Sequence, residues 1–148
     1  MSREYFKRRQ RQRGSAMLEL AVCSFLLLYI LTGIIEFSRA FYTADVVVNA
    51  ARAGAAYGSQ SQALSKDYSG MQTAAINDAG SASVVSATAS QYCECPGSHT
   101  SVDCSTIVCS GKLKYVKVTS TASYSTLGSY SWIPNPMTVS STAYVRVK

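Results

Sequence analysis

The sequence predicts an α+β protein with a long N-terminal helix, a second short helix and a small three-stranded antiparallel sheet. Three observations support this class. Residues 16–35 form a nearly continuous apolar run, and an apolar stripe at helical spacing continues it to residue 58. Three later segments are rich in Val, Thr, Ser and Tyr, which favour strands. The 148 residues suffice for this helix and one modest domain.

Positive charge is concentrated at the N-terminus. Residues 1–13 contain six Lys or Arg and one Glu, so they carry +5 of the formal net charge of +6. The rest of the chain is nearly neutral. This distribution argues against a basic nucleic-acid-binding surface, so no nucleic-acid partner is expected.

The apolar run from Ala16 to Ile35 is long enough to cross a bilayer, which requires about 20 residues. Because the basic segment precedes it, the positive-inside rule places the N-terminus in the cytoplasm and the later residues outside. A cleaved secretory signal peptide is the alternative. Its apolar region should be only about 7–15 residues long and end at a small-residue cleavage site, which is not found here.

Glu19 lies inside this run, where an ionised carboxylate is costly and usually has a partner. Proteolysis after Gly14 would give Ser15 a new α-amino group and make Glu19 the fifth residue. In an assembly of parallel helices, that ammonium group could neutralise Glu19 of a neighbouring chain. Glycine suits the cut site because it lets a protease approach the backbone closely. Alternatively, Glu19 reaches the cytoplasmic headgroups.

The helix is expected to continue beyond the membrane because no Pro or Gly follows Ile35 until Gly54. Its apolar stripe consists of Phe37, Ala40, Phe41, Ala44, Val47, Val48, Ala51, Gly54, Ala55 and Gly58. This stripe packs either on the protein's own C-terminal domain or on neighbouring subunits. Glu36 and Arg39 are spaced for a local ion pair. The expected boundaries are a basic leader at 1–14, a transmembrane and stalk helix at 15–58, and an outer α+β domain at 59–148.

The outer domain begins with a predicted helix at residues 62–79, which Gly80 ends. Strands are predicted at residues 83–91, 115–124 and 138–147. The connection between the last two is rich in turn residues. Its Trp132 is expected to be a packing anchor rather than a ligand platform.

Five cysteines divide into two groups. Cys23 lies in the apolar run and is expected to behave as a small apolar side chain. The other four, Cys93, Cys95, Cys104 and Cys109, are expected to form two disulfides in an oxidising compartment. A Cys93–Cys95 bridge is disfavoured by their spacing, but the other two pairings remain open. A zinc site with His99 is the alternative, although Cys-x-Cys is not the usual zinc spacing.

Catalytic motifs are missing from the sequence. It has a single His, no Gly-rich phosphate loop and no Gly-x-Ser-x-Gly nucleophile motif. The chain is therefore predicted not to be an enzyme and to need no cofactor.

The basic leader, Gly14 and Glu19 together resemble the class III signal of type IV prepilins. The segments Gly33–Tyr42 and Val48–Ala55 resemble the TadE-like family of minor pilins (pseudopilins) from tight-adherence (Flp-type IVb) pilus systems. The resemblance implies a pilin-like lollipop that a prepilin peptidase cuts after Gly14 and that acts in pilus assembly or initiation. It also implies the major pilin, other pseudopilins, and an inner-membrane platform with its ATPase as partners.

The expected location is the cytoplasmic (inner) membrane as a single-pass protein, followed by the periplasm or a pilus at the cell surface. Two alternatives remain. One is a signal-anchored extracytoplasmic binding module whose helix is only a tether. The other is a pseudopilin of a type II-like secretion system.

Overall fold

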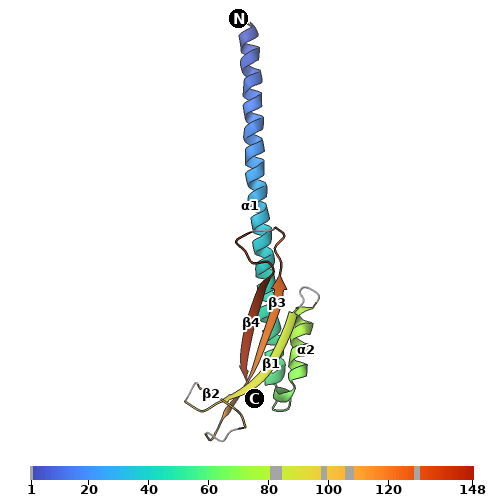
Figure 1. Cartoon of the computed structure of the whole chain (residues 1–148), viewed down its shortest axis with the longest axis vertical. Helices are drawn as coiled ribbons and strands as arrows, with labels where there is room; N and C mark the ends of the chain where they lie inside the picture. Colours follow the sequence, from blue (N-terminus) through green and yellow to red (C-terminus); the bar gives the residue numbers. More distant parts are fainter. Residues whose placement is uncertain (1, 81–84, 98–99, 106–108, 129–130) are drawn as a thin grey trace. The chain divides into compact units, whose positions relative to one another are not determined.

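A computed structural model describes residues 2–80, 85–97, 100–105, 109–128 and 131–148, with side chains from Ser15 onward. The elements are helix α1 (Ser2–Ser59), the 3-10 helix η1 (Leu64–Lys66), helix α2 (Tyr68–Ala79), and strands β1 (Val85–Glu94), β2 (Ser101–Val102), β3 (Leu113–Tyr124) and β4 (Met137–Arg146) (Figure 1). The chain forms two compact units, Met1–Arg39 and Ala40–Lys148. The last third of α1 therefore belongs to the C-terminal domain.

The sheet is antiparallel throughout, in the order β2-β1-β3-β4. β1 pairs with β3 from Val85↔Ala122 to Glu94↔Leu113. β3 pairs with β4 from Tyr115↔Arg146 to Tyr124↔Met137. The long helix, the short second helix and the antiparallel sheet confirm the predicted α+β class.

The sheet has one strand more than the sequence predicts. β2 is a two-residue strand that pairs Cys93 with Val102 and Glu94 with Ser101. Such a segment is too short to show an alternating pattern, and the Cys93–Cys104 disulfide holds it beside β1. The other strands lie close to their predicted ranges, apart from predicted residues 83–84, which are outside the described residues.

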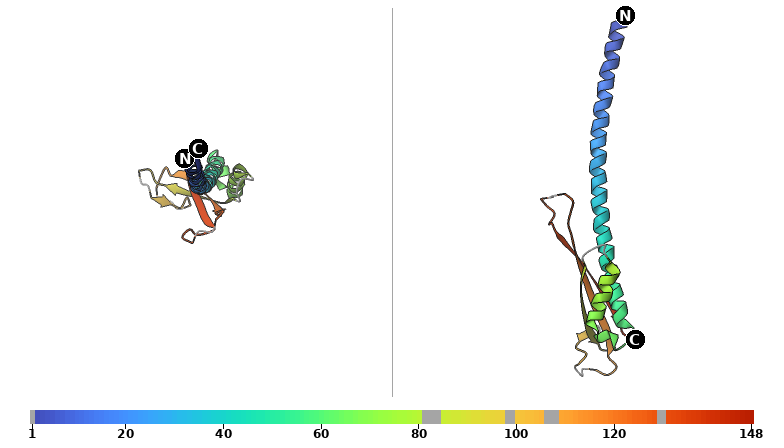
Figure 2. Two further views of the ribbon diagram at one scale, coloured as in Figure 1. Left: turned by 90° about the horizontal axis from the view of Figure 1, so that it is seen from above. Right: turned by 90° about the vertical axis from the view of Figure 1, so that its right-hand side faces the viewer.

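One face of the sheet, here called the helix face, packs against α2 and the last third of α1 (Figure 2). Alternate residues of β3 supply its centre, with Val116, Val118, Ser120 and Ala122 almost fully buried. The core also contains Val47, Ala50, Ala55, Met71, Ala75, Ala79, Val85 and Val147. Most of these side chains are small, which lets the helices lie close to the sheet.

At Gly54, α1 lies close to the backbone of α2. A Cβ atom at this position would lie 2.7 Å from the backbone oxygen of Met71 and 3.1 Å from the Ala75 Cβ. From Val47 to Gly58 the stripe predicted along α1 is buried except at Val48, which is half-buried, so this part packs on the protein's own domain.

The predicted second helix is divided at Asp67. Its first part is η1, and α2 begins one residue after Asp67, whose Oδ1 accepts a 2.9 Å hydrogen bond from the Gly70 amide. This is an N-cap, which satisfies a free amide at the start of α2. Gly80, with φ of 58°, is the C-cap, as predicted.

Trp132 is 78% exposed and is not the packing anchor that the sequence predicts. It lies in the connection between β3 and β4, outside the core cluster. The core between sheet and helices consists of Ala, Val and Met side chains, and a core built of such small side chains has little room for an indole.

Candidate functional site

The N-terminal helix carries the first candidate site. Between Ser15 and Ser59 it contains one stretch long and apolar enough to cross a membrane, and none of its 18-residue window is buried. Large apolar side chains project from it on all sides, for example Met17 (77% exposed), Phe25 (76%) and Tyr29 (74%). A helix that is apolar all round suits lipid contact. This segment indicates a membrane-anchored single-pass protein.

Three hydroxyl side chains in this helix bond to its own backbone. The hydroxyls of Ser24, Thr32 and Ser38 donate to the carbonyls four residues earlier, at 2.7, 2.9 and 2.8 Å. Such bonds remove the cost of an unpaired hydroxyl in hydrocarbon. Cys23 is a free, exposed cysteine.

Glu19 has no such bond within the helix. Its side chain is exposed, and within the part of the chain described with side chains it has no hydrogen-bond or ion-pair partner. Ser15 lies one helical turn before it, on the same face of α1. The helix also runs without a break through Gly14, the predicted cut site. The part of the chain described with side chains therefore supplies Glu19 with no partner.

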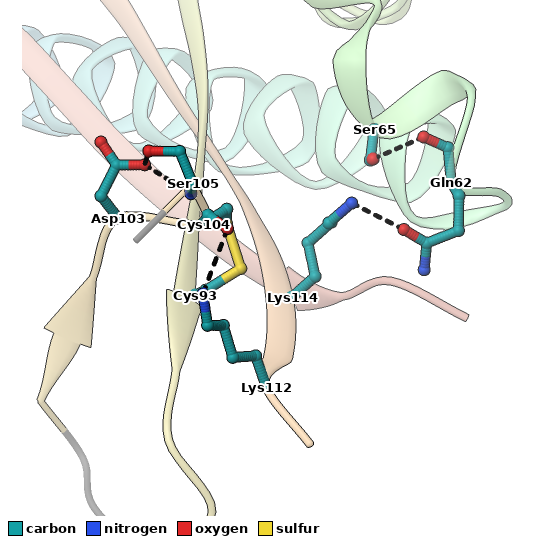
Figure 3. Close-up of a disulfide and its surroundings, with 8 residues drawn as sticks. All are labelled: Gln62, Ser65, Cys93, Asp103, Cys104, Ser105, Lys112 and Lys114. Carbon is teal, nitrogen blue, oxygen red and sulfur yellow. Dashed lines mark hydrogen bonds between the residues drawn. A yellow bond between two sulfur atoms is a disulfide. The ribbon is translucent and has the colours of Figure 1, made fainter. Parts of the chain in front are cut away.

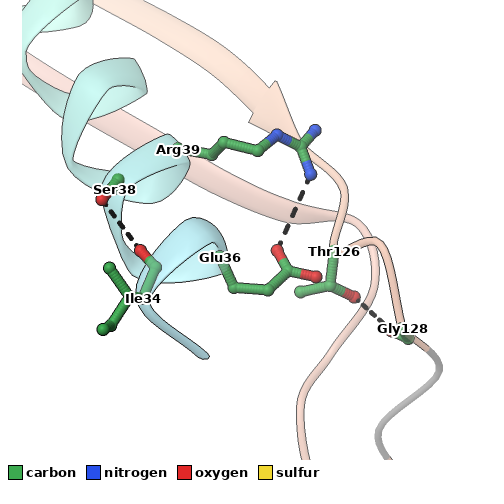
Figure 4. Close-up of polar contacts among 6 residues, drawn as sticks. All are labelled: Ile34, Glu36, Ser38, Arg39, Thr126 and Gly128. Atoms are coloured by element: carbon green, nitrogen blue, oxygen red, sulfur yellow. Dashed lines mark hydrogen bonds and ion pairs between the residues drawn. The ribbon is translucent and has the colours of Figure 1, made fainter. Parts of the chain in front are cut away.

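Glu36 and Arg39 lie just after the apolar run and form the expected local contact. Arg39 Nη1 lies 3.7 Å from Glu36 Oε2 (Figure 4). This spacing joins successive turns of one helix, where an ion pair contributes a few tenths of a kcal/mol, roughly 0.2–0.5.

This helix contains the region of family similarity. Residues 14–56 match the family described as TadE-like protein. The segment is TadE-like. The match covers less than half of the chain and spans Gly14, Glu19, the Glu36–Arg39 pair and the first buried positions of the domain. No curated protein and no solved structure matched the chain.

The match shows that residues 14–56 are similar to TadE-like proteins. The recognition made from Gly33–Tyr42 and Val48–Ala55 is confirmed, because both segments lie within the matched residues.

The second candidate site is the cysteine cluster of the outer domain. Cys93 is bonded to Cys104 (Figure 3). Cys95 is bonded to Cys109, so the pairing is one of the two arrangements left open by the sequence. With all four thiols in disulfides, they are not available as metal ligands. The zinc alternative also relied on His99, which lies outside the described residues. Among the described residues, no group of three or more His, Cys, Asp or Glu could hold a metal ion.

The loop closed by these disulfides is further ordered by Asp103. Its Oδ1 accepts hydrogen bonds from the Ser105 amide at 2.8 Å and the Ser105 hydroxyl at 2.7 Å. These bonds, and to a smaller extent the charge of Lys112, hold the pKa of Asp103 below its ordinary value. Asp103 therefore stays ionised at neutral pH.

The sequence analysis missed a cluster of basic residues beside these disulfides. A groove of about 590 Å³ is lined by Lys66, Lys112, Lys114, Arg146 and Lys148. Four of them are close to one another only because β3 begins where β4 ends. The sequence does contain a signal, because these five basic residues of the outer domain lie in only three short segments. The signal was missed because the net charge beyond the leader is close to zero.

Proposed function

We propose that the chain is a minor prepilin (pseudopilin) that a prepilin peptidase cuts after Gly14 and that then acts in assembly or initiation of a tight-adherence pilus. The observation that carries this proposal is the TadE-like match, which begins at Gly14 itself. The residues before Gly14 form the basic leader, and those after it form the apolar helix.

Cleavage requires access to the Gly14–Ser15 bond. Because α1 continues through this bond, the helix has to open locally before a peptidase can bind the backbone. Glycine is about 1 kcal/mol less favourable in a helix than Ala, so the helix opens most easily there. Gly14 thus serves the reaction both through its flexibility and through its lack of a side chain.

Glu19 would then act in assembly. After cleavage, Ser15 carries an ammonium group one turn from Glu19, at nearly the same depth in the membrane. In a bundle of parallel helices, the ammonium of one chain pairs with Glu19 of its neighbour, and both charges are neutralised in hydrocarbon. The exposed apolar surface of residues 15–35 supplies the remaining contact area with the major pilin and other pseudopilins.

The proposed topology places the basic N-terminus in the cytoplasm and the domain outside, in accordance with the positive-inside rule. Two disulfides in the domain support an oxidising compartment. The assembly platform in the inner membrane and its ATPase would act on the membrane helix, while the domain reaches the periplasm or the cell surface.

Processing is tested by co-expression with an active prepilin peptidase, followed by mass spectrometry of the N-terminus. We expect a chain that begins at Ser15, normal cleavage of Gly14→Ala, and blocked cleavage of Gly14→Leu, whose side chain obstructs the peptidase. A second prepilin cut in the same cells shows that the peptidase is active. If the chain then still begins at Met1, the prepilin proposal is wrong, and a tethered binding module takes its place.

A further inference from the structure

The loop between β3 and β4 carries the most exposed large apolar side chains of the outer domain. Trp132 is 78% exposed and Leu127 is 67% exposed, and among the described residues from Ala40 onward no other large apolar side chain exceeds them. Exposed apolar side chains that gather in one region mark a contact surface. Where this loop lies in the domain therefore decides what it can contact.

The loop lies at the end of the sheet on the side of Ala40, where the domain begins (Figure 1). At the opposite end, the Lys148 amide donates a 3.2 Å hydrogen bond to the carbonyl of Ser59, the last residue of α1. From there the paired strands run to Tyr124 and Met137, which are opposite each other and flank the loop. The loop thus lies far from the end of α1 and close to the start of the domain.

The lengths of strand and helix give the level of the loop along α1. Val118 lies beside Gly54, since a Cβ at Gly54 would be 3.0 Å from a Val118 methyl group. From Val118 to Tyr124 the strand advances about 20 Å. The same distance along α1 leads back from Gly54 to about Phe41. Thr43 is only 7% exposed, so the domain does cover α1 at this level.

The covalent chain holds this end of the domain near the membrane. The apolar run ends at Ile35, and the domain begins at Ala40. The helical residues between them span about 8 Å. This length is close to the thickness of one headgroup layer, roughly 5–8 Å. The start of the domain, and the β3–β4 loop beside it, therefore lie near the lipid headgroups.

Charge is distributed along the sheet in a way that suits this location. Residues 118–145, which include the loop, contain no Asp, Glu, Lys or Arg. On α1, the first charged residue of the domain is Asp45. Cations gather at the other end of the sheet, where five of them line the groove here called the basic groove (Lys66, Lys112, Lys114, Arg146 and Lys148). Contact of the loop with lipid would therefore remove no charged side chain of the hairpin from water, a change that would be costly.

The exposed side chains at this end are of the kinds found at membrane–water interfaces. Seven large apolar side chains of the domain are exposed in the part that the structure describes. Four of them lie at this end, namely Phe41 and Tyr42 on α1 and Leu127 and Trp132 on the loop. Trp and Tyr are enriched at membrane interfaces because each has an apolar body and a polar group that forms hydrogen bonds. A protein partner could also cover such a surface, but the membrane is the partner that the chain itself holds beside it.

We propose that Trp132 and Leu127 insert into the headgroup layer of the bilayer that α1 crosses, so that the β3–β4 loop is a second membrane contact of the outer domain. The partner is the interface of a phospholipid bilayer without net charge, because the loop has no cation to pair with an anionic headgroup. Phe41 and Tyr42 extend this contact along α1. The proposal rests on the membrane anchor and not on cleavage or pilus assembly, so its failure would leave the proposed function unaffected.

Trp132 is the only Trp of the chain, so its fluorescence reports on the loop directly. The test uses the full chain reconstituted in phosphatidylcholine vesicles whose lipids carry bromine either near the headgroups or deep in the acyl chains. We expect blue-shifted emission relative to indole in water, and stronger quenching by the shallow bromine atoms than by the deep ones. About 1 M salt should leave this quenching unchanged, because the contact contains no charge pair for salt to screen.

The matched control moves the indole to the other end of the same hairpin by combining Trp132→Phe with Tyr144→Trp. Tyr144 is 56% exposed, and it lies about 23 Å from Met137 along β4. Brominated lipid should not quench the control. Acrylamide dissolved in the water should quench Trp132 with a constant roughly three- to tenfold smaller than that of the control, the range expected when an apolar side chain of this size is about half buried. A melting temperature equal to that of the original chain shows that the control is folded.

Three results would overturn the proposal. If Trp132 has the emission and the acrylamide quenching of the control, the loop stays in water. If brominated lipid quenches both indoles equally, the whole domain adsorbs to the vesicle without a specific contact of the loop. If the emission of Trp132 is blue-shifted but brominated lipid does not quench it, protein covers the indole, as a second copy of the chain would.

Discussion

The Tyr57 hydroxyl donates a 2.9 Å hydrogen bond to Oδ2 of Asp67, joining the last turns of α1 to the first turn of α2. The other oxygen of the same carboxylate accepts from the Ser69 hydroxyl and the Gly70 amide, both at 2.9 Å. Asp67 is thus both the N-cap of α2 and its tie to α1. Gly70 fits here because a Cβ at this position would collide with Asp67 and Tyr57.

This arrangement predicts acid sensitivity of the contact between α1 and α2. The hydrogen bonds from Gly70, Ser69 and Tyr57 lower the pKa of Asp67 from its ordinary value of 3.8. A carboxylate with a lowered folded-state pKa stabilises the fold above its ordinary pKa, and this contribution disappears as the pH falls through the folded-state value. Asp67→Asn should therefore lower the melting temperature at pH 7 and lose that effect near pH 2. A melting-temperature difference that does not change with pH would contradict this role.

The same hydrogen bond predicts that the contact between α1 and α2 weakens at alkaline pH, when its donor, Tyr57, loses its proton. The hydrogen bond to Asp67 raises the pKa of Tyr57 above its ordinary value of 10.0, with burial and the Asp67 charge contributing further. The stabilisation is complete below pH 10 and disappears as the pH rises through the folded-state pKa. Tyr57→Phe should destabilise the domain at pH 7 by less than Asp67→Ala, which also removes the helix cap. Thermal melts followed by circular dichroism provide the comparison.

Gly54→Ala is predicted to separate α1 from α2. Its new Cβ would lie 2.7 Å from a backbone oxygen, which cannot move aside as a flexible side chain does. Overpacking of this kind costs roughly 1–3 kcal/mol. Denaturant unfolding of the domain measures this loss of stability. Gly33→Ala is the matched control, since a Cβ at Gly33 meets nothing within 4 Å. An unchanged unfolding midpoint for Gly54→Ala would contradict the close packing.

Ser120 has a fully buried hydroxyl without a hydrogen-bond partner among the described residues. A buried, unsatisfied hydroxyl destabilises a fold, whereas an apolar group of similar size does not. We therefore predict that Ser120→Ala raises the free energy of unfolding by up to about 1 kcal/mol. A clear loss of stability would mean that the hydroxyl has a bonding role.

The sequence predicted the elements whose signal is local. The continuous apolar run predicted the membrane helix, and periodicity predicted the face of α1 that is buried between Val47 and Gly58. The break at Asp67 was missed because a single capping aspartate gives a weaker signal than the apolar spacing around it. β2 was missed because its position depends on the Cys93–Cys104 disulfide rather than on its two residues.

Features that depend on pairing between distant segments could not be predicted from the sequence either. The basic groove is formed only when Lys114 and Arg146 meet at one end of the sheet, and this depends on the β3–β4 register. Trp132 was predicted to be buried from its residue type alone, but the surrounding loop decides its exposure. Glu19 is different, because its importance follows from its depth in an apolar run, which the sequence shows directly.

The two disulfides are predicted to stabilise the outer domain by about 2–4 kcal/mol each. Thiol labelling of the native protein from the oxidising compartment should modify only Cys23. Replacing Cys93 and Cys104 by Ser should release β2 from β1 and lower the melting temperature of the domain. Replacing Cys95 and Cys109 by Ser is the matched control for β2, because neither residue pairs with it. Four free outer thiols together with bound zinc would contradict the disulfide assignment.

Glu19→Leu separates an assembling pilin from a simple tether. In a lone anchor the carboxylate is unfavourable, so its replacement should leave insertion and cleavage intact or improve them. In an assembly, the same change leaves the Ser15 ammonium of a neighbouring chain buried without a partner, at a cost of roughly 3–5 kcal/mol. We therefore expect the variant to be made, inserted and cleaved, but not to support pili or to co-purify with other pilins.

Two controls sharpen this comparison. Glu19→Asp keeps the charge and shortens its reach by one methylene, so piliation should be intermediate. Glu36→Gln removes a carboxylate that lies outside the apolar run and already contacts Arg39 in its own chain, so it should leave assembly nearly unchanged. The measurement is pilus production in a strain whose only copy carries each variant. Normal piliation with Glu19→Leu would contradict the pairing of Glu19 with Ser15 and favour a tether.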